Sequence, residues 1–164
     1  MIRPARPEDA AAIAGVQVRA WWHAYADVVD REHLAERTTA SRTERWREIL
    51  ASGRTETAVA EVSGRLAGFA SIGAPMHADP APGLGELLAL YVDPPAQGAG
   101  IGTALLADAE ERLRAQGFAR ALLGVFEANG LARAFYGARG WRDEEPRVVL
   151  EDRWAPEIRM FKEL

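Results

Sequence analysis

A glycine-rich turn between a buried strand and a helix constrains the fold of this chain more than any other segment. Residues 86–92 read ELLALYV, an apolar run of the length of a buried strand. Residues 101–116 carry apolar side chains at every fourth position, which predicts an amphipathic helix. Gly98, Gly100 and Gly102 let an oxyanion approach the backbone closely, and the start of a helix presents unpaired N–H groups. The segment therefore predicts an anion-binding turn.

The remaining segments predict a sheet with helices on its faces. Residues 1–4 predict a first strand, and Pro7, Glu8 and Asp9 suit the first turn of a helix. The other predicted elements are a helix over 30–50, a hairpin of strands at 57–62 and 66–72, a loop at 75–85, a strand at 121–126, a helix over 130–139, and strands at 148–150 and 158–161. This order belongs to the α/β class with a mixed sheet, and 164 residues suit a single domain spanning 1–164.

The composition excludes several kinds of site and partner. The chain has no Cys, and His23, His33 and His77 lack the spacing of a metal site, so we expect no metal. No apolar run approaches the ~20 residues of a membrane span, and the N-terminus lacks the apolar segment of a secretory signal. The formal net charge of −4 argues against nucleic acid and membrane as partners. We therefore expect a cytoplasmic protein, and the abundance of Ala and Arg points to a GC-rich, bacterial genome.

Three cofactor motifs could use the glycine-rich turn. A nucleotide-binding P-loop needs Gly-Lys-Ser/Thr, which is absent. A dinucleotide fingerprint needs G-x-G-x-x-G directly after the strand, whereas a five-residue spacer intervenes here and Thr103 occupies the sixth position. The pattern that fits is Gln97-x-x-Gly100-x-Gly102 after a strand that ends in Val-Asp-Pro.

This pattern resembles the cofactor motif of the GCN5-related N-acetyltransferase (GNAT) family, Q/R-x-x-G-x-G/A. After the next strand, residues 129–141 resemble the second family signature, N-x-x-A-x-x-F-Y-x-x-x-G-F, with Trp141 in place of the usual Phe. Chain length, element order and the distance between the two motifs also match. The resemblance implies a single-domain, mostly antiparallel mixed sheet flanked by helices and splayed from its neighbour at the strand ending in Val92.

The resemblance implies acetyl-CoA as co-substrate and locates its binding residues. The pantetheine arm would pair with the strand, and the pyrophosphate would lie on the amides of the turn. The implied binding residues are Leu90, Tyr91, Val92, Gln97, Gly98, Ala99, Gly100, Ile101, Gly102, Thr103 and Asn129. Many family members carry Arg or Lys where this chain has Gly98 and Ala99, so phosphate binding would depend on backbone amides. Arg133 and Arg139 are the open alternatives for the 3′-phosphate.

Acetylation of an amine poses two proton problems, and the first is the departing thiolate. In the family, the Tyr of the second signature is held to protonate it, which assigns that role to Tyr136. Asn129 and Tyr136 are seven residues apart and share a helical face. The alternatives are that Asn129 is only a helix cap and Tyr136 only a core residue.

The second problem is the acceptor amine, which must lose a proton before it attacks. Glu86 is the candidate base. It is in phase with Leu88, Leu90 and Val92 on an apolar strand, where a carboxylate is unusual and suggests a functional role. The alternative is a solvated Glu at the start of the strand. Asp93 and Glu127 are weaker candidates.

The wall of the acceptor pocket is expected from the first helix. Family members commonly use this region, which here holds Trp21, Trp22, His23 and Tyr25. Adjacent Trp residues cannot face the same way, so core packing with one surface Trp is an equal alternative.

The sequence therefore predicts an N-acetyltransferase that moves acetyl from acetyl-CoA directly to a small-molecule or peptide amine. The absence of Cys and of any other placed nucleophile disfavours a covalent acyl-enzyme. The alternative is a non-catalytic acyl-CoA-binding or sensing domain on the same fold. Homodimers are common in the family and are a further expectation.

Overall fold

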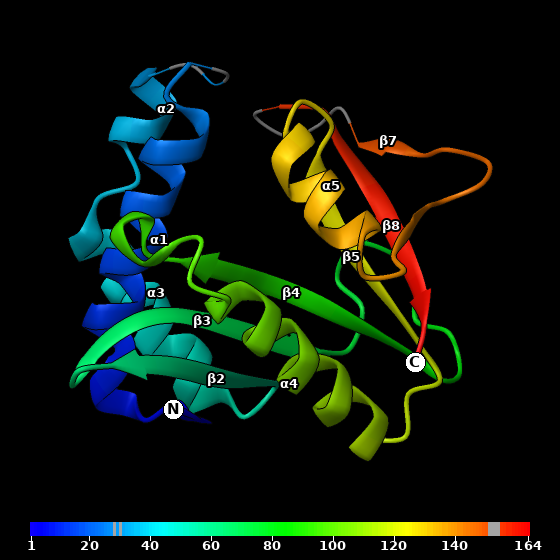
Figure 1. Ribbon diagram of the computed structural model, residues 1–164, viewed down its shortest axis with the longest axis horizontal. Coiled ribbons are helices and arrows are strands. Elements are labelled where there is room, and N and C mark those ends of the chain that lie inside the picture. The colour runs from blue at the N-terminus through cyan, green and yellow to red at the C-terminus, as the bar shows by residue number, and fades with distance from the viewer. Residues whose placement is uncertain (28, 30, 151–154) are drawn as a thin grey trace.

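Strands from the whole length of the chain form one sheet in this computed structural model, which describes residues 1–27, 29, 31–150 and 155–164 (Figure 1). Within these residues the strand order is β1-β2-β3-β4-β5-β8-β6, with β7 beside β8. The bounds are β1 (Ile2–Pro4), β2 (Thr55–Val62), β3 (Arg65–Gly73), β4 (Leu84–Val92), β5 (Arg120–Phe126), β6 (Arg142–Asp143), β7 (Val149–Leu150) and β8 (Glu157–Glu163). Among these strands only β4 and β5 pair in parallel, so the predicted mixed, mostly antiparallel sheet is confirmed.

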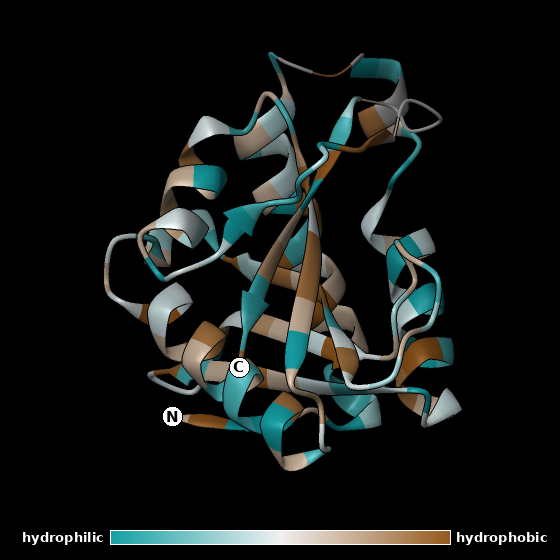
Figure 2. Ribbon diagram, turned by 90° about the vertical axis from the view of Figure 1, so that its right-hand side faces the viewer, coloured by the Kyte–Doolittle hydropathy of each residue, from teal (hydrophilic) through white to brown (hydrophobic). Residues whose placement is uncertain are grey.

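Helices cover both faces of the sheet. The described helices are α1 (Ala10–Tyr25), α2 (Arg31–Ala35), α3 (Thr39–Ser52), α4 (Ile101–Ala115) and α5 (Gly130–Gly137), with short 3-10 turns η1 (Pro7–Asp9) and η2 (Pro94–Ala96). Ile13 of α1 and Trp46 of α3 pack against Phe69 on one face. Leu105 of α4 and Tyr136 of α5 belong to the cluster on the other face. Figure 2 shows the hydrophobic residues concentrated in the central strands. No described helix has the length and apolar character needed to cross a membrane.

The predicted helix over 30–50 is two helices, α2 and α3. Thr38 separates them in an extended conformation (φ −72°, ψ 156°), and its hydroxyl accepts a hydrogen bond from the N–H of Ser41 at 3.1 Å. A capping threonine starts a new helix instead of continuing the old one. Asp30, the first residue of the predicted helix, lies outside the described residues. The predicted hairpin is confirmed, and Ser63 and Gly64 form its turn with φ of 50° and 74°.

The parallel contact between β4 and β5 is short. It joins Leu84–Glu86 to Arg120–Leu122, and beyond it the strands diverge (Figure 1). This divergence is the splay that was expected at the strand ending in Val92. It leaves the rest of β4 without a strand partner on its β5 side among the described residues.

A β-bulge lies where the strands separate. The register between β3 and β4 moves from Ser71↔Ala89 to Ile72↔Leu87, so Leu88 is an extra residue. The bulge reverses the alternation of β4, because Leu87 before it and Leu90 after it pack against the same cluster. The predicted phase relation is therefore wrong: Glu86 faces the side of the sheet opposite to Leu90.

Candidate active site

The divergence of β4 and β5 opens a cavity of about 630 Å³. Its wall contains parts of β4, β5, α1 and α5, the turn after β4, His77 from the loop before β4, and Glu157 at the start of β8. Predicted site residues in this wall are Tyr25, Leu90, Tyr91, Val92, Gln97, Gly98, Gly100, Gly102, Thr103, Asn129 and Tyr136. Ala99 and Ile101 belong to the same turn but do not line the cavity.

The glycine-rich turn forms a cradle of free amides at one end of the cavity. In the described part of the chain, the backbone N–H groups of residues 98–103 have no hydrogen-bond acceptor. Gly98 and Gly100 have φ of 80° and 81°, which disfavours any side chain, and the space next to each is open. Gly100 is also the N-cap of α4, so the positive end of the helix dipole points into the cradle. The arrangement fits a pyrophosphate group.

Gln97 and Gly102 hold this turn against its neighbours. The side-chain amide of Gln97 donates to the carbonyl of Val92 at 3.2 Å and so fixes the turn to the end of β4. A Cβ at Gly102 would lie 3.5 Å from both Val92 and the ring of Phe135. A Cβ would be in ordinary van der Waals contact there, so the start of α4 lies close to both the strand and α5.

Of the two arginines considered for the 3′-phosphate, only Arg139 lines the cavity that the described residues form. Its guanidinium carbon lies 3.9 Å from the centre of the Phe135 ring, and Nη2 donates to Oγ1 of Thr103 at 2.6 Å. Its Nε is buried and has no acceptor among the residues that the structure describes. Arg133 instead forms an ion pair with Asp143 at 2.9 Å. Arg139 thus brings a positive charge to the cradle that Gly98 and Ala99 do not supply.

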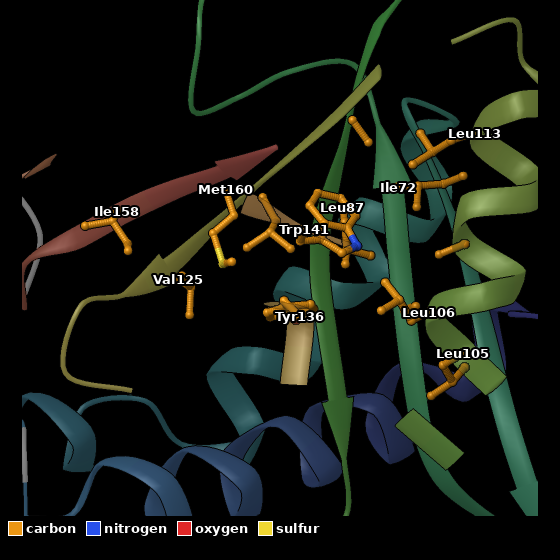
Figure 3. Packing of buried hydrophobic residues seen from close by; sticks show 14 of the residues in the cluster. Ile72, Leu87, Leu105, Leu106, Leu113, Val125, Tyr136, Trp141, Ile158 and Met160 are labelled. Atoms are coloured by element: carbon orange, nitrogen blue, oxygen red, sulfur yellow. The ribbon is translucent and has the colours of Figure 1, made fainter. Parts of the chain in front are cut away.

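Tyr136 lies in the space between the diverging strands (Figure 3). The side chain is only 9% exposed, and its ring packs edge-on against Phe135 and Trp141. Its hydroxyl has no hydrogen-bond partner among the described residues, and Tyr136 lines the cavity. Burial, followed by the nearby Tyr91 and Tyr25, raises the pKa of Tyr136 above its usual value. The hydroxyl is therefore a protonated donor available to a ligand.

Asn129 caps α5 and also lines the cavity. Its Oδ1 accepts from the N–H of Ala132 at 3.0 Å, and its Nδ2 donates to the hydroxyl of Tyr25 at 2.9 Å. The structure therefore shows the capping role considered for Asn129, and the cofactor contact stays a prediction. Burial raises the pKa of Tyr25, whose ring packs edge-on against Phe126.

Glu86 is fully buried and lies outside the cavity wall that the described residues form. Its carboxylate accepts hydrogen bonds from the N–H groups of Met76 and His77 and contacts Nδ1 of His77. His77 does line the cavity, with its Nε2 3.5 Å from Oε1 of Glu157. Sequence reasoning missed His77 and Glu157 as site residues because neither belongs to a motif. Only the fold reveals the connection to Gly124, where a Cβ would collide with the Glu157 carboxylate.

The structure does not bring the other candidates into the cavity wall formed by the described residues. Trp21 is 5% exposed and donates to the Tyr91 hydroxyl at 2.9 Å, Trp22 is partly buried beside it, and His23 is exposed. Asp93 pairs with Arg19 and Glu127 pairs with Arg147. No group of three His, Cys, Asp or Glu among the described residues could hold a metal ion.

Comparisons with known proteins agree with this geometry. A family model described as the acetyltransferase (GNAT) family matches residues 17–141. The uncharacterised N-acetyltransferase YuaI of Bacillus subtilis (strain 168) is 30% identical over 151 residues, covering 92% of this chain and 82% of that protein. The PaiA N-acetyltransferase of Thermoplasma acidophilum, solved with coenzyme A, superposes with a TM-score of 0.79 at 21% identity, covering 100% of this chain and 98% of that one. YncA of Salmonella typhimurium, solved with acetyl-CoA, gives a TM-score of 0.72 at 24% identity, with coverage of 100% and 93%.

Proposed function

This chain belongs to the acetyltransferase (GNAT) family, and from that premise we propose that it transfers an acetyl group from acetyl-CoA directly to the nitrogen of an amine. The observation that carries the proposal is the cavity between β4 and β5, because one wall contains the amide cradle and Tyr136, whose hydroxyl has no partner in the described part of the chain. Direct transfer is supported by the absence of cysteine from the chain. The acceptor is a small molecule or a peptide with a free amine.

The cofactor end of the cavity would be built from backbone groups. The unpaired edge of β4 from Leu90 to Val92 would hydrogen-bond the amides of the pantetheine arm, in the manner of an added strand. The cradle at 98–103 would bind the pyrophosphate, and Arg139 would add a cation next to it. Acetyl-CoA supplies the activated thioester, and the protein supplies its orientation. The co-substrates of PaiA and YncA support this reading.

Tyr136 would protonate the thiolate that leaves. A phenol with a raised pKa stays protonated at working pH, and its proton stabilises charge that develops only in the transition state. Asn129 would hold the start of α5, and hence Tyr136, against α1.

The test is thiol release from acetyl-CoA in the presence of a panel of amines: a polyamine, an aminoglycoside, free amino acids and a peptide with a free N-terminus. The protein contributes no thiol of its own, so a thiol reagent reports CoA alone. We expect CoA release that depends on one class of amine, with the acetylated amine detected by mass spectrometry. Binding of CoA without release above the uncatalysed rate for any amine would instead identify a non-catalytic acyl-CoA-binding domain.

A further inference from the structure

Three ionisable side chains from separate parts of the chain meet at one end of the cavity, two of them in its wall and one buried behind it. Glu86 comes from β4, His77 from the loop that precedes β4, and Glu157 from β8. His77 stands between the two carboxylates, with Nδ1 on Glu86 and Nε2 3.5 Å from Glu157. A histidine held by a buried carboxylate on one nitrogen and facing a cavity with the other is the arrangement of an oriented base.

We propose that His77 accepts the proton of a cationic amine acceptor, that Glu86 positions its imidazole, and that Glu157 faces the ammonium group. The proposal rests on the acetyl transfer proposed above and names the acceptor class, a primary amine that arrives protonated. The general base is then His77, which lines the cavity, and not Glu86, which was expected from the sequence.

Glu86 fits a positioning role because its carboxylate is fully occupied. It is 0% exposed, accepts from the N–H of His77 at 3.1 Å and from that of Met76, and holds the imidazole of His77. A buried carboxylate accepts hydrogen bonds from donors, so the contact favours a proton on Nδ1. That tautomer leaves the lone pair of the neutral imidazole on Nε2.

Glycine at position 124 makes room for the other two side chains. Gly124 lines the cavity on β5, and a Cβ there would lie 2.0 Å from Oε1 of Glu157 and 3.4 Å from Cδ2 of His77. Any side chain at 124 would therefore displace the carboxylate. Arg159, whose Nη1 donates to the carbonyl of His77 at 3.0 Å, is a further charged neighbour.

Tyr136 provides the complementary donor in the same cavity. It is nine-tenths buried and its hydroxyl has no partner among the described residues, so the cavity holds an acid and a base on different elements. The ammonium gives one proton to Nε2 of His77, and the nitrogen lone pair forms the C–N bond. The C–S bond breaks with its electron pair on sulfur, which takes a proton from Tyr136. The nitrogen loses its second proton once the C–N bond has formed, and that proton returns Tyr136 to its phenol form through solvent. His77 then releases its own proton to solvent.

The main test is His77→Ala, assayed with the best amine at saturating acetyl-CoA. We expect kcat to fall roughly 100- to 10,000-fold, the usual contribution of a general base, with CoA affinity unchanged by calorimetry. Added imidazole should restore part of the rate in His77→Ala and none in Tyr136→Phe. Glu48→Ala is the control, because Glu48 is an exposed residue of α3 and lies outside the cavity wall of the described residues. It should retain wild-type kinetics.

Two further variants separate positioning and binding from base chemistry. Glu86→Gln should lower kcat more than it raises the amine KM and should displace the acidic limb of the pH–rate profile, which a purely structural role would not move. Glu157→Gln should mainly raise the KM of a cationic amine. If His77→Ala lowers stability, His77→Asn keeps a side-chain donor for Glu86 and still removes the base.

The outcomes distinguish this inference from the proposed function. A folded His77→Ala or His77→Asn enzyme with wild-type kcat would overturn the role of His77 and leave acetyl transfer intact. A loss that imidazole does not restore and that appears only as weaker CoA binding would make His77 structural. A wild-type protein that acetylates no amine would overturn both.

Discussion

The side-chain amide of Asn129 donates a hydrogen bond to the hydroxyl of Tyr25, 2.9 Å away. The two residues are far apart in the sequence, and the bond joins the last residue of α1 to the cap of α5. Both side chains line the cavity, so the bond fixes the separation of two of its walls. In the proposed function, this one neutral hydrogen bond would couple the acceptor side of the cavity to the cofactor side.

Asn129→Ala should weaken both the fold and the cavity. Loss of the cap on Ala132 should lower the free energy of unfolding by about 1 to 2 kcal/mol, measured by denaturant titration. The freed Tyr25 should raise the acetyl-CoA KM as well. Thr38→Ala removes the corresponding cap of α3, which lies outside the described cavity wall, and should lower stability alone. Equal KM values in the two variants would show that the Asn129–Tyr25 bond does not shape the site.

Gly100→Asp should abolish tight CoA binding. It places a side chain and a negative charge at the cradle, where a positive φ and an open space now favour glycine. We expect calorimetry to show at least a roughly 100-fold rise in Kd, because a negative charge opposes the pyrophosphate at close range. Gly117→Asp is the matched control, since Gly117 has φ of 87° and open space but lies beyond the far end of α4. Similar CoA affinity in both variants would move the phosphate site away from the turn.

Arg139→Gln should weaken CoA binding roughly 10- to 100-fold, the range for one charge-assisted hydrogen bond of about 1.5 to 3 kcal/mol. Arg133→Gln should leave the affinity unchanged, because Arg133 pairs with Asp143. Dephospho-CoA, which lacks the 3′-phosphate, shows which phosphate group the Arg139 guanidinium binds. If the effect of Arg139→Gln persists with dephospho-CoA, the guanidinium binds the pyrophosphate; if it vanishes, the guanidinium binds the 3′-phosphate. Loss in Arg133→Gln alone would reverse the assignment.

Alkaline pH should destabilise the fold through three tyrosines, of which Tyr136 is buried and Tyr25 and Tyr91 are partly buried. Burial raises the pKa of Tyr25, Tyr91 and Tyr136, so the folded state holds these protons more tightly than the unfolded chain does. The resulting stability is fully present below the unfolded value of about 10 and is lost as pH rises toward the raised folded values. Denaturant midpoints should therefore fall above that pH, and less steeply in Tyr136→Phe. A flat profile would mean that these hydroxyls ionise as easily in the folded state.

The parts of the site that the sequence could predict are local. The turn after β4 and the capped helix α5 each lie within one continuous segment, where glycine spacing and a capping Asn specify the backbone directly. Thr38 carried an equally local signal for the break between α2 and α3. These elements required no knowledge of distant contacts.

The remaining features depend on contacts between distant segments. The bulge at Leu88 arises from the register with β3, and it reverses the face of Glu86. His77 reaches the cavity because a loop folds back onto a buried carboxylate, and Glu157 because β8 pairs with β5. Residue spacing along the chain does not predict these long-range contacts. His77 and Glu157 therefore could not be identified as site residues from the sequence.

Tyr136→Phe tests the central claim most directly. The substitution keeps the ring packed against Phe135 and Trp141 and removes only the unpartnered hydroxyl, so the fold and CoA binding should be nearly unchanged. The measurement is kcat at saturating acetyl-CoA and amine, under conditions where chemistry limits the rate. We predict a fall of roughly 10- to 1000-fold, or about 1.4 to 4 kcal/mol, and a smaller deficit for a thioester with a more acidic thiol. A wild-type kcat in this variant would contradict the account and leave Tyr136 as a core residue.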